Sequence, residues 1–444
     1  MKRFYLLTIA VLCSMFAMAQ DFDVISPEGV EMVFSILDEE QKTCSLDAMY
    51  VDGDFENDDD YVAYKNSIKS ITIPPIAEGY KLTTINDFAF RGWSSLTSIV
   101  IPEGVTTIQG QAFKDCTALE RLVIPTSVSE LNLNDVLGYN GGKSLKELCI
   151  PVWMVTQTWS TLIGNMLNWF SSRPSITDLY VNAPDMEYWC ANGFGCCYNL
   201  GGNYQMPAVH MMVNGKEVTE VVIPNSVTEI VVGAFHSLSE ITKVEIPSSV
   251  TSMGMLAFRL CSSLREVTIP GSIHFIPDDS FSRTGLEQVI IPEGVDTLDQ
   301  WAFDNCAQLK RVTLPSTLKA IGRMAFKADT ELVEVTSFMT EPCEAGSGYD
   351  FGPGAIEKAF EVISPNAVLR VPMGCKAKYE AIPSWSESFS QIIEFDVNAV
   401  SAPHVTSESA TTIYSTDGKF RSNLSRGLNI IRHKNNTITK VISR

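Results

Sequence analysis

The apolar residues of this chain recur with a period of about 23 residues over much of its length. An Ile or Leu followed by proline recurs at Ile101, Ile124, Ile150, Ile223, Ile246, Ile269, Ile291 and Leu314, and the later spacings are 23, 23, 22 and 23 residues. An Ala-Phe or Ser-Phe pair keeps the same period at Phe90, Phe113, Phe235, Phe258, Phe281, Phe303 and Phe326. Two markers in phase over this length indicate an internal repeat.

Each position of the repeat has a physical role. The consensus unit reads I-P-x-S-V-x-x-I-x-x-x-A-F-x-x-C-x-x-L-x-x-V-x. The L-x-x-V-x-I part predicts a short strand with Val and Ile facing inward, and the proline, which has no N–H to donate, ends it. The S-V-x-x-I part supplies apolar residues on the returning leg, and the Ala-Phe pair turns the chain with Phe inside. One such coil cannot bury these residues alone, so the pattern predicts a stacked solenoid.

We therefore predict a β-rich repeat solenoid with short helical turns and a parallel sheet along one face, over residues 71–398, with an irregular segment at 151–216. Residues 20–70 are expected to form a capping β segment that shields the first coil. Residues 399–411 are rich in Ser, Thr and Ala and predict a linker. Residues 412–444 show short alternating runs separated by turn residues, which predicts a small C-terminal β module.

The first 19 residues have the pattern of a secretory signal peptide. Lys2 and Arg3 precede an apolar run, and a small-x-small motif ends at Ala19, so cleavage is expected between Ala19 and Gln20. The apolar run is short for a membrane span, and no later window is long and apolar enough. We expect an exported mature chain without a membrane-spanning segment.

Composition and charge narrow the classes of partner. The chain has 444 residues, of which 45% are hydrophobic and 19% charged, as in ordinary globular proteins. Lys and Arg number 33 against 52 Asp and Glu, which gives a net charge of -19. A chain this acidic repels nucleic-acid phosphates and anionic lipid, so neither is an expected partner.

The repeat unit resembles the BspA-like leucine-rich repeat, whose arrays read IPxSVTxIGxxAFxxCxxLxxVxIP. Clear units span about residues 70–170 and 217–337, and Leu369 to Phe389 resembles the usual last segment of such arrays. The resemblance implies a secreted or surface protein that binds partners, and some members are adhesins.

The C-terminal residues resemble the sorting domain of the type IX secretion system of Bacteroidota. Tyr414, the Gly418-Lys419 pair and Gly427 match its pattern, whereas Asn429 stands where an aromatic residue is usual. The resemblance implies delivery to the extracellular or outer-membrane surface, with a periplasmic location as the alternative. A strand module that only closes the fold is the competing interpretation.

Three cysteines occupy one repeat position. Cys116, Cys261 and Cys306 each lie three residues after the conserved Phe, where the consensus faces the interior. Cys261 and Cys306 are two coils apart, about 10 Å at the strand spacing, whereas a disulfide requires Cα atoms within about 7 Å. We expect these three to be buried thiols that act as small apolar residues.

The irregular segment 151–216 contains four tryptophans and the neighbouring Cys190, Cys196 and Cys197, for which a local disulfide stays open. Residues 158–170 predict a helix, residues 176–181 a degenerate strand, and residues 210–222 a hairpin with a type I′ turn at Asn214-Gly215. Two interpretations are open: a pair of decayed coils, or an insertion whose aromatic residues carry a recognition surface.

No motif predicts catalysis, a cofactor or a metal. None of the five histidines has a ligand spacing of the HExxH or Cys/His type, and His236 and His274 are expected on solvated turns. The acidic run at residues 52–60 is either a solvated loop or a calcium site, although it lacks the glycine and distal Glu of an EF-hand. Walker A and GxSxG motifs are missing, so we expect a protein that is not an enzyme; a catalytic site within 151–216 is a remote alternative.

The outward positions of the strands form the candidate binding face. Its charged residues are Arg121, Glu147, Lys243, Glu266, Arg311 and Glu334. Mixed charges on neighbouring strands suit cross-strand pairing, so the row either stabilises an exposed sheet or forms an extended binding surface. The leading hypothesis is a non-catalytic binding or adhesion module for a host matrix protein, a glycan or another surface protein. The alternative is a structural envelope scaffold without an external ligand.

Overall fold

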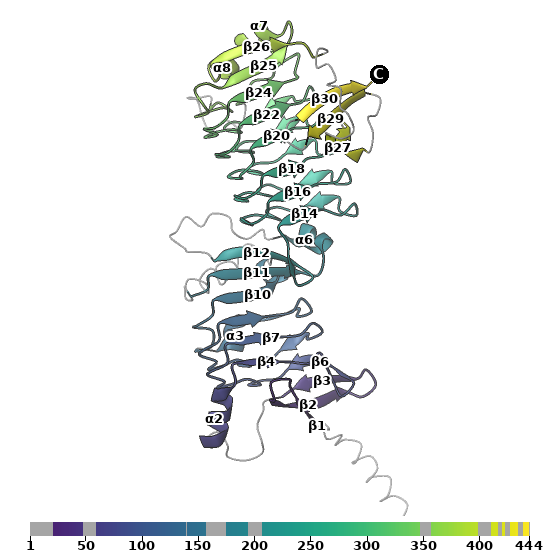
Figure 1. Cartoon of the computed structure of the whole chain (residues 1–444), viewed down its shortest axis with the longest axis vertical. Coiled ribbons are helices and arrows are strands. Elements are labelled where there is room, and N and C mark those ends of the chain that lie inside the picture. The colour runs from purple at the N-terminus through teal and green to yellow at the C-terminus, as the bar shows by residue number, and fades with distance from the viewer. Residues whose placement is uncertain are drawn as a thin grey trace, which may run out of the picture. The chain divides into compact units, whose positions relative to one another are not determined.

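The computed structural model describes residues 21–47, 59–138, 140–156, 175–193, 207–346 and 357–397, and four strands between 410 and 443. The chain divides into two compact units, residues 1–182 with 202–208, and residues 183–201 with 209–444. Each unit contains stacked short strands, so the predicted repeat solenoid is confirmed (Figure 1). Among the described residues, no helix has the length and apolar character needed to cross a bilayer.

The main sheet of the first unit is parallel. In spatial order its strands are β11 (Asp178–Ala183), β10 (Glu147–Pro151), β9 (Arg121–Val123), β7 (Ser98–Val100) and β4 (Ser70–Thr72). Ile71, Ile99, Leu122 and Leu148 are in register across four of these strands, and all four are buried. The expected degenerate strand at residues 176–181 is β11, which pairs with β10.

The first unit begins with antiparallel strands. They are β1 (Asp21–Ile25), β2 (Glu31–Asp38) and β3 (Thr43–Leu46), and β3 pairs in parallel with β6 (Tyr80–Ile85). Strand β6 also pairs with β5 (Ile76–Ala77) and β8 (Thr107–Ile108). Helix α2 (Asp59–Ser67) holds the end of the acidic run; residues 52–58 of that run lie outside the described residues.

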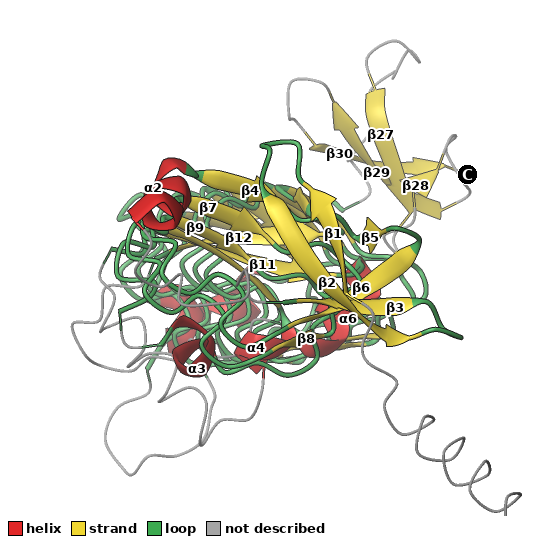
Figure 2. Cartoon of the chain, turned by 90° about the horizontal axis from the view of Figure 1, so that it is seen from below, coloured by secondary structure: helices red, strands yellow, loops and turns green. Residues whose placement is uncertain are grey.

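Short helices replace part of the repeat turn in the first unit. Helix α3 (Leu133–Leu137) is capped by Asn132, whose side chain accepts from the backbone N–H groups of Asn134 and Asp135. Helix α4 (Trp153–Thr156) follows β10. Figure 2 shows α3 and α4 on the opposite side of this unit from β4, β7, β9 and β11.

The second unit begins with helix α6 (Met186–Asn192) and, from residue 209 onward, a hairpin of β12 (Ala208–Val213) and β13 (Lys216–Glu217). Asn214 and Gly215 both have positive φ, as the predicted type I′ turn requires. The returning strand is shorter than expected, because Glu220–Val222 forms β14 and pairs in parallel with β16 instead. The helix predicted at 158–170, and Cys196 and Cys197, lie outside the described residues.

Parallel strands continue through the second unit. The outward-facing sheets are β14 (Glu220–Val222), β16 (Lys243–Glu245) and β18 (Glu266–Thr268), then β20 (Gln288–Ile290), β22 (Arg311–Leu314), β24 (Glu334–Ser337), β25 (Val368–Pro372) and β26 (Gln391–Phe395). The returning legs give β15 (Glu229–Ile230) with β17 (Ser252–Met253), and β19 (Phe275–Ile276), β21 (Thr297–Leu298) and β23 (Ala320–Ile321).

The ladder between β18 and β20 is interrupted where one coil is a residue shorter. The preceding coil has the four residues Cys261 to Leu264 at this turn, whereas the shorter coil has only Thr284, Gly285 and Leu286. The Arg265 guanidinium fills this place and donates to the carbonyl oxygens of Ser262 at 2.8 Å and Gly285 at 3.0 Å. The 22-residue spacing in the sequence therefore marks a division of the sheet into two parts.

A stack of phenylalanine rings forms the interior of the second unit. Ring centroids of Phe235, Phe258, Phe281, Phe303 and Phe326 follow one another at 4.9, 5.2, 5.2 and 5.3 Å, and the planes are nearly parallel. The predicted interior role of the Phe is confirmed. The stack continues through Phe360 to Trp385 and Phe389, near helices α7 (Lys376–Glu380) and α8 (Pro383–Ser386).

In the turn around the Phe, some residues other than glycine have positive φ, the left-handed region. The sequence pattern did not predict this conformation. In the coil of Phe303, both Trp301 and Asn305 have positive φ, of 53° and 55°. The same two positions in the next coil, Met324 and Ala328, have 55° and 61°. Such conformations cost free energy in residues other than glycine, so the stacking of neighbouring coils must hold them.

The cysteine prediction is confirmed. Cys116, Cys261 and Cys306 are fully buried free thiols, and each donates from Sγ to the carbonyl oxygen of the Phe one coil earlier, at 3.0, 3.0 and 3.1 Å. Burial raises the pKa of all three thiols, for Cys116 to about 12. Cys190 is also buried and free.

One histidine prediction is wrong. His274 is exposed as expected, but His236 is buried, with 3% of its surface exposed. Other coils place Lys114 or Arg259 at this position after the Phe, and these long side chains remain partly exposed. The imidazole is too short to carry its polar tip to solvent from there, and it bonds the Ser237 hydroxyl at 2.7 Å instead.

The C-terminal strands form a separate antiparallel sheet. Its order is β28 (Phe420–Arg421), β27 (Ala410–Ser415), β29 (Gly427–His433) and β30 (Ile438–Ser443). A β module was expected here from residue 412, and its first strand begins two residues earlier, at Ala410.

Candidate functional site

The charged row on the first unit's sheet joins neighbouring strands. Arg121 on β9 and Glu147 on β10 are directly opposite in the register. The Arg121 Nε lies 3.0 Å from a Glu147 carboxylate oxygen, and each side chain is nearly half exposed, at 47% and 44%. The structure therefore brings these two predicted residues together as a cross-strand pair, which contributes about 0.2–1 kcal/mol.

The second unit repeats this arrangement on β14, β16 and β18. Glu220, Lys243 and Glu266 are in register, so the signs of charge alternate across the three strands. The Lys243 ammonium lies 2.5 Å from Glu245, two residues along the same strand. The positive charge of this part of the face is therefore largely neutralised by neighbouring carboxylates.

Arg311 differs from the other two basic residues of the face. It lies opposite Glu334 in the register of β22 and β24, but the Glu334 carboxylate pairs with Arg370 at 3.5 Å. Arg311 is exposed, and no hydrogen bond or ion pair joins it to any other residue that the structure describes. Its guanidinium is thus available to a partner, with Gln288 on one side and Glu334 on the other.

Apolar side chains accompany the charges on the outward face. Val222 of β14 is 62% exposed and Ile393 of β26 is 37% exposed. In the first unit, Val100 of β7 is 45% exposed. β-branched residues suit the pleated surface, and single exposed apolar residues are common, so these side chains add contact area without forming a large patch.

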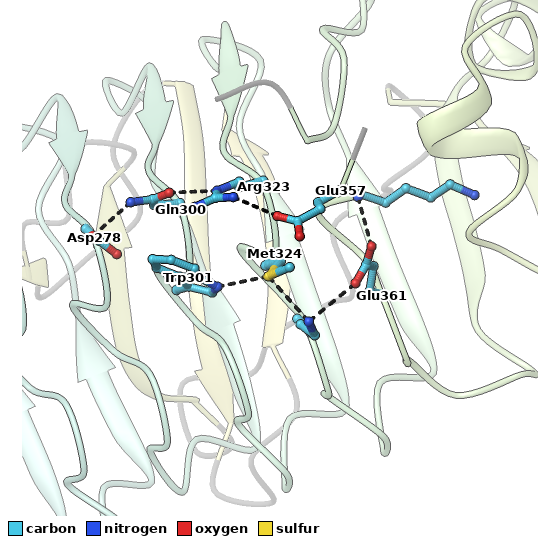
Figure 3. A network of polar contacts seen from close by, with 9 residues as sticks. Asp278, Gln300, Trp301, Arg323, Met324, Glu357 and Glu361 are labelled. Carbon is cyan, nitrogen blue, oxygen red and sulfur yellow. Dashed lines mark hydrogen bonds and ion pairs between the residues drawn. The ribbon is translucent and has the colours of Figure 1, made fainter. Parts of the chain in front are cut away.

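A polar network lies at the Phe turns of the second unit, where the sequence analysis predicted no site (Figure 3). Gln300 donates to Asp278 at 3.1 Å and accepts from Arg323 at 2.9 Å, and Arg323 donates to Glu357 at 2.8 Å. These residues come from successive coils and occupy equivalent positions near the turn. Burial is the main cause that raises the pKa of Asp278 to about 6, whereas the Gln300 hydrogen bond opposes the shift.

Trp301 and Met324 form the second layer of this network. The Arg323 guanidinium lies 4.9 Å from the Trp301 ring centre, and the indole N–H contacts Met324 Sδ at 3.0 Å (Figure 3). Lys327 joins Met324 to Glu361, 3.6 Å away. Most of these polar groups are used in contacts between coils, so the arrangement stabilises the stack of coils, although Asp278 Oδ1 is buried without a hydrogen-bond partner among the residues that the structure describes.

The comparisons with known proteins agree with this architecture. The model of the BspA type leucine rich repeat region matches residues 42–157 and 212–333 in six copies, more than half of the chain. The chain belongs to the BspA-type leucine-rich repeat proteins. A search of the curated proteins found no match.

The solved structures that match this BspA-type chain do so at low identity and low TM-score. A leucine-rich repeat protein from Bacteroides ovatus is 16% identical, with a TM-score of 0.36 and coverage of 85% of this chain and 89% of the other. A leucine rich cell surface protein from Faecalibacterium prausnitzii is 18% identical, with a TM-score of 0.30 and coverage of 71% and 94%. The pneumococcal vaccine antigen PcpA is 13% identical, with a TM-score of 0.36 and coverage of 85% and 99%.

The period of the BspA-type repeat made some residues of the candidate site predictable from the sequence and left others unpredictable. The strand rows follow from the period, so all six predicted charges fall on outward strand positions. The network at the turns was missed because its residues occupy variable positions of the consensus, and only the stacking brings them into contact. Neighbouring coils differ there in residue type, so the repeat carries no signal for it.

Proposed function

We propose that this BspA-type protein is a secreted or cell-surface, non-catalytic module that binds a protein or glycan through the sheet of β20 to β26. The observation that supports the proposal is the exposed Arg311, whose guanidinium is unpaired among the described residues. Arginine is enriched among residues that dominate binding energy, and its planar fork can hold a carboxylate or sulfate with two parallel hydrogen bonds.

The surroundings of Arg311 favour an acidic group on the partner. The Glu334 carboxylate opposite Arg311 pairs with Arg370, which removes its competition for the Arg311 guanidinium. Outward Thr313 and Thr336 lie in register on the adjacent strands β22 and β24 and offer hydroxyl groups close by. An acidic side chain of a protein, or a uronate or sulfate of a glycan, fits this combination of charge and hydroxyl groups.

Extended repeat sheets suit binding rather than catalysis. They offer a row of similar outward positions that can contact a long ligand at many points. Leucine-rich repeat families are generally non-catalytic, and the solvent-shielded thiols of the repeat are poor nucleophiles because burial raises their pKa. Both observations support a binding role.

Binding assays with two defined anionic probes test the proposal. Because the acidic chain repels long polyanions, we expect short oligosaccharides of heparin, which are sulfated, or of polygalacturonate, which are carboxylated, to bind the full chain, and to bind more weakly as salt increases. Arg311→Ala should reduce affinity by about 10-fold, equivalent to about 1.4 kcal/mol. Arg283→Ala is the matched control, because Arg283 is also an exposed arginine and lies at the turn after Phe281, outside the strands of the proposed face.

The two variants separate a specific face from general electrostatics. Equal losses for Arg311→Ala and Arg283→Ala would show that charge alone attracts the probe and would contradict the proposed face. A panel of extracellular-matrix proteins extends the same comparison to protein partners. A chain that binds no probe and no matrix protein would instead favour the alternative of an envelope scaffold, in which cross-strand pairs such as Arg121–Glu147 only stabilise the sheet.

The C-terminal sheet supports a role in delivery to the cell surface. We propose that residues 412–444 act as a type IX sorting module, on the basis of their motif resemblance and their separate antiparallel strands. Protease treatment of intact cells should degrade the full chain, whereas a chain that ends at residue 398 should be protected inside the envelope. Equal surface exposure of the two chains would exclude a sorting role.

A further inference from the structure

We propose that His210, Glu217 and Glu240 form a binding site for a divalent transition-metal ion with the preferences of Zn²⁺. One ligand atom from each of these three residues lies within 4.8 Å of the other two. All three residues belong to the second unit, away from the outward face of β20 to β26.

Two separate parts of the fold build the cluster. His210 lies on β12, and Glu217 of β13 pairs with Met212, two residues after His210, so the hairpin places the His210 and Glu217 side chains on the same face. Glu240 comes from the turn that precedes β16, after Leu238 of the first regular coil in this unit. A metal ion would therefore connect the hairpin to the repeat.

The distances suit a shared cation. His210 Nδ1 lies 2.9 Å from a Glu240 carboxylate oxygen and 3.3 Å from a Glu217 carboxylate oxygen. A tetrahedral ion with bonds of about 2.0–2.2 Å holds its ligand atoms roughly 3.3–3.6 Å apart. Small rearrangements of the two glutamate side chains would bring the three atoms to that spacing.

The chemistry of the three groups supports the same conclusion. A ring nitrogen offers either one hydrogen or one lone pair, so Nδ1 cannot give a full hydrogen bond to two carboxylates at once. The two carboxylates also repel each other at this separation. A divalent cation satisfies the nitrogen lone pair and neutralises both negative charges.

The exposure of the residues allows an ion to enter. The His210 side chain is only 10% exposed, so its ring is fixed, whereas the side chains of Glu217 and Glu240 are 47% and 45% exposed. A buried imidazole with two carboxylates that reach solvent gives one rigid ligand and two adjustable ligands. Such a site has an entry path, which a metal site needs.

The donor set favours zinc over calcium. Calcium takes six to eight oxygen ligands, and a neutral imidazole nitrogen is a poor substitute for one of them. One nitrogen and two carboxylate oxygens suit Zn²⁺, and three protein ligands leave a fourth position for water or a group from a partner.

Isothermal titration of the tag-free full chain with ZnCl₂, after treatment with a chelator and dialysis, tests the proposal. We expect one ion bound per chain at this cluster and an increase in melting temperature, because an ion that binds only the folded state stabilises it. His210→Gln and Glu240→Gln should each weaken binding by at least about 10-fold. Glu229→Gln is the matched control, because Glu229 is an exposed carboxylate on β15 outside the cluster.

Two further measurements make the outcome unambiguous. Co²⁺ bound at this site should show no thiolate charge-transfer band, which distinguishes it from an ion held by cysteine. Circular dichroism in chelator should show that the variants fold like the parent chain; if His210→Gln does not fold, Glu217→Gln, whose carboxylate is half exposed, replaces it. The proposal is overturned if the chain binds no Zn²⁺, if binding is unchanged in the folded variants, or if the Co²⁺ spectrum shows thiolate ligands.

Discussion

The thiol of Cys261 lies 3.0 Å from the carbonyl oxygen of Phe235, one coil earlier in the solenoid. The same contact joins Cys306 to Phe281 at 3.1 Å, so the cysteine position links each of these two coils to its predecessor. The apolar environment raises the pKa of both thiols above their ordinary value.

This contact predicts that the repeat cysteines are chemically inert in the folded protein. Iodoacetamide at pH 8 should leave Cys261 and Cys306 unmodified, because the thiolate is the reactive form and burial disfavours it. The same residues should be fully alkylated in denaturant. Mass spectrometry of peptides from both conditions gives the result, and modification at equal rates in the two would contradict the packing.

The phenylalanine stack predicts a large loss of stability on truncation. Phe281→Ala should lower the free energy of unfolding by about 3–5 kcal/mol, because the ring is fully buried between Phe258 and Phe303 and its removal leaves a cavity. Phe275→Ala is the control, since that ring is 46% exposed on the returning leg and should cost far less. Urea denaturation gives both values, and similar losses would show that the stack does not hold the coils together.

Because Asp329 is buried, we predict that the free energy of unfolding falls as pH rises. Asp329 occupies the cysteine position of its coil, is fully buried, and accepts the Cys306 backbone N–H at 2.7 Å. Burial raises its pKa well above the ordinary value, so the native state retains a proton that the unfolded chain loses above about pH 4. Stability contributed by the protonated form is therefore present below pH 4 and decreases towards neutral pH.

The variant Asp329→Asn tests this effect. The amide keeps an acceptor for the Cys306 N–H but cannot ionise, so it should be at least about 1 kcal/mol more stable than the parent at pH 7.5. The difference should shrink as pH falls towards 3.5. Urea midpoints measured across this range provide the check; a constant difference at every pH would mean that ionisation of Asp329 plays no part.

Because His236 is buried, we predict a contribution to the free energy of unfolding that rises with pH, opposite to that of Asp329. Burial is the main cause that lowers the pKa of His236 to about 4, and the Arg259 charge adds to the effect. The unfolded chain takes up a proton near pH 6.5 while the native state does not, so stability is full above pH 6.5 and is lost as pH falls towards 4.

The expected slope for His236 is about 1.4 kcal/mol per pH unit between these two pKa values. His236→Gln should reduce this slope, because glutamine keeps polar atoms but does not titrate. His274→Gln is the matched control, since it replaces an exposed histidine by the same residue. Thermal melts between pH 4 and 7 measure the slopes, and an unaltered slope in the His236 variant would place the imidazole in solvent.

The 23-residue period determined the repeat fold, the inward Phe and the buried cysteines, because every coil must bury the same residues against its neighbours. The same period placed Arg121, Lys243 and Arg311 on the outward strand positions, since alternate residues of a strand face opposite sides. The missing residue between Ile269 and Ile291 was visible in the sequence as well, although only the structure shows the interrupted ladder there.

Only the tertiary structure decided which side chains meet across coils. Arg311 and Arg121 have the same repeat position. Arg121 pairs with Glu147, whereas Arg311 is left available because Glu334 pairs with Arg370. His210 and Glu240 are 30 residues apart and follow no ligand motif, so their approach depends on how the hairpin packs on the adjacent turn. A repeating pattern specifies what each coil buries, whereas contacts between variable positions depend on the geometry of stacking.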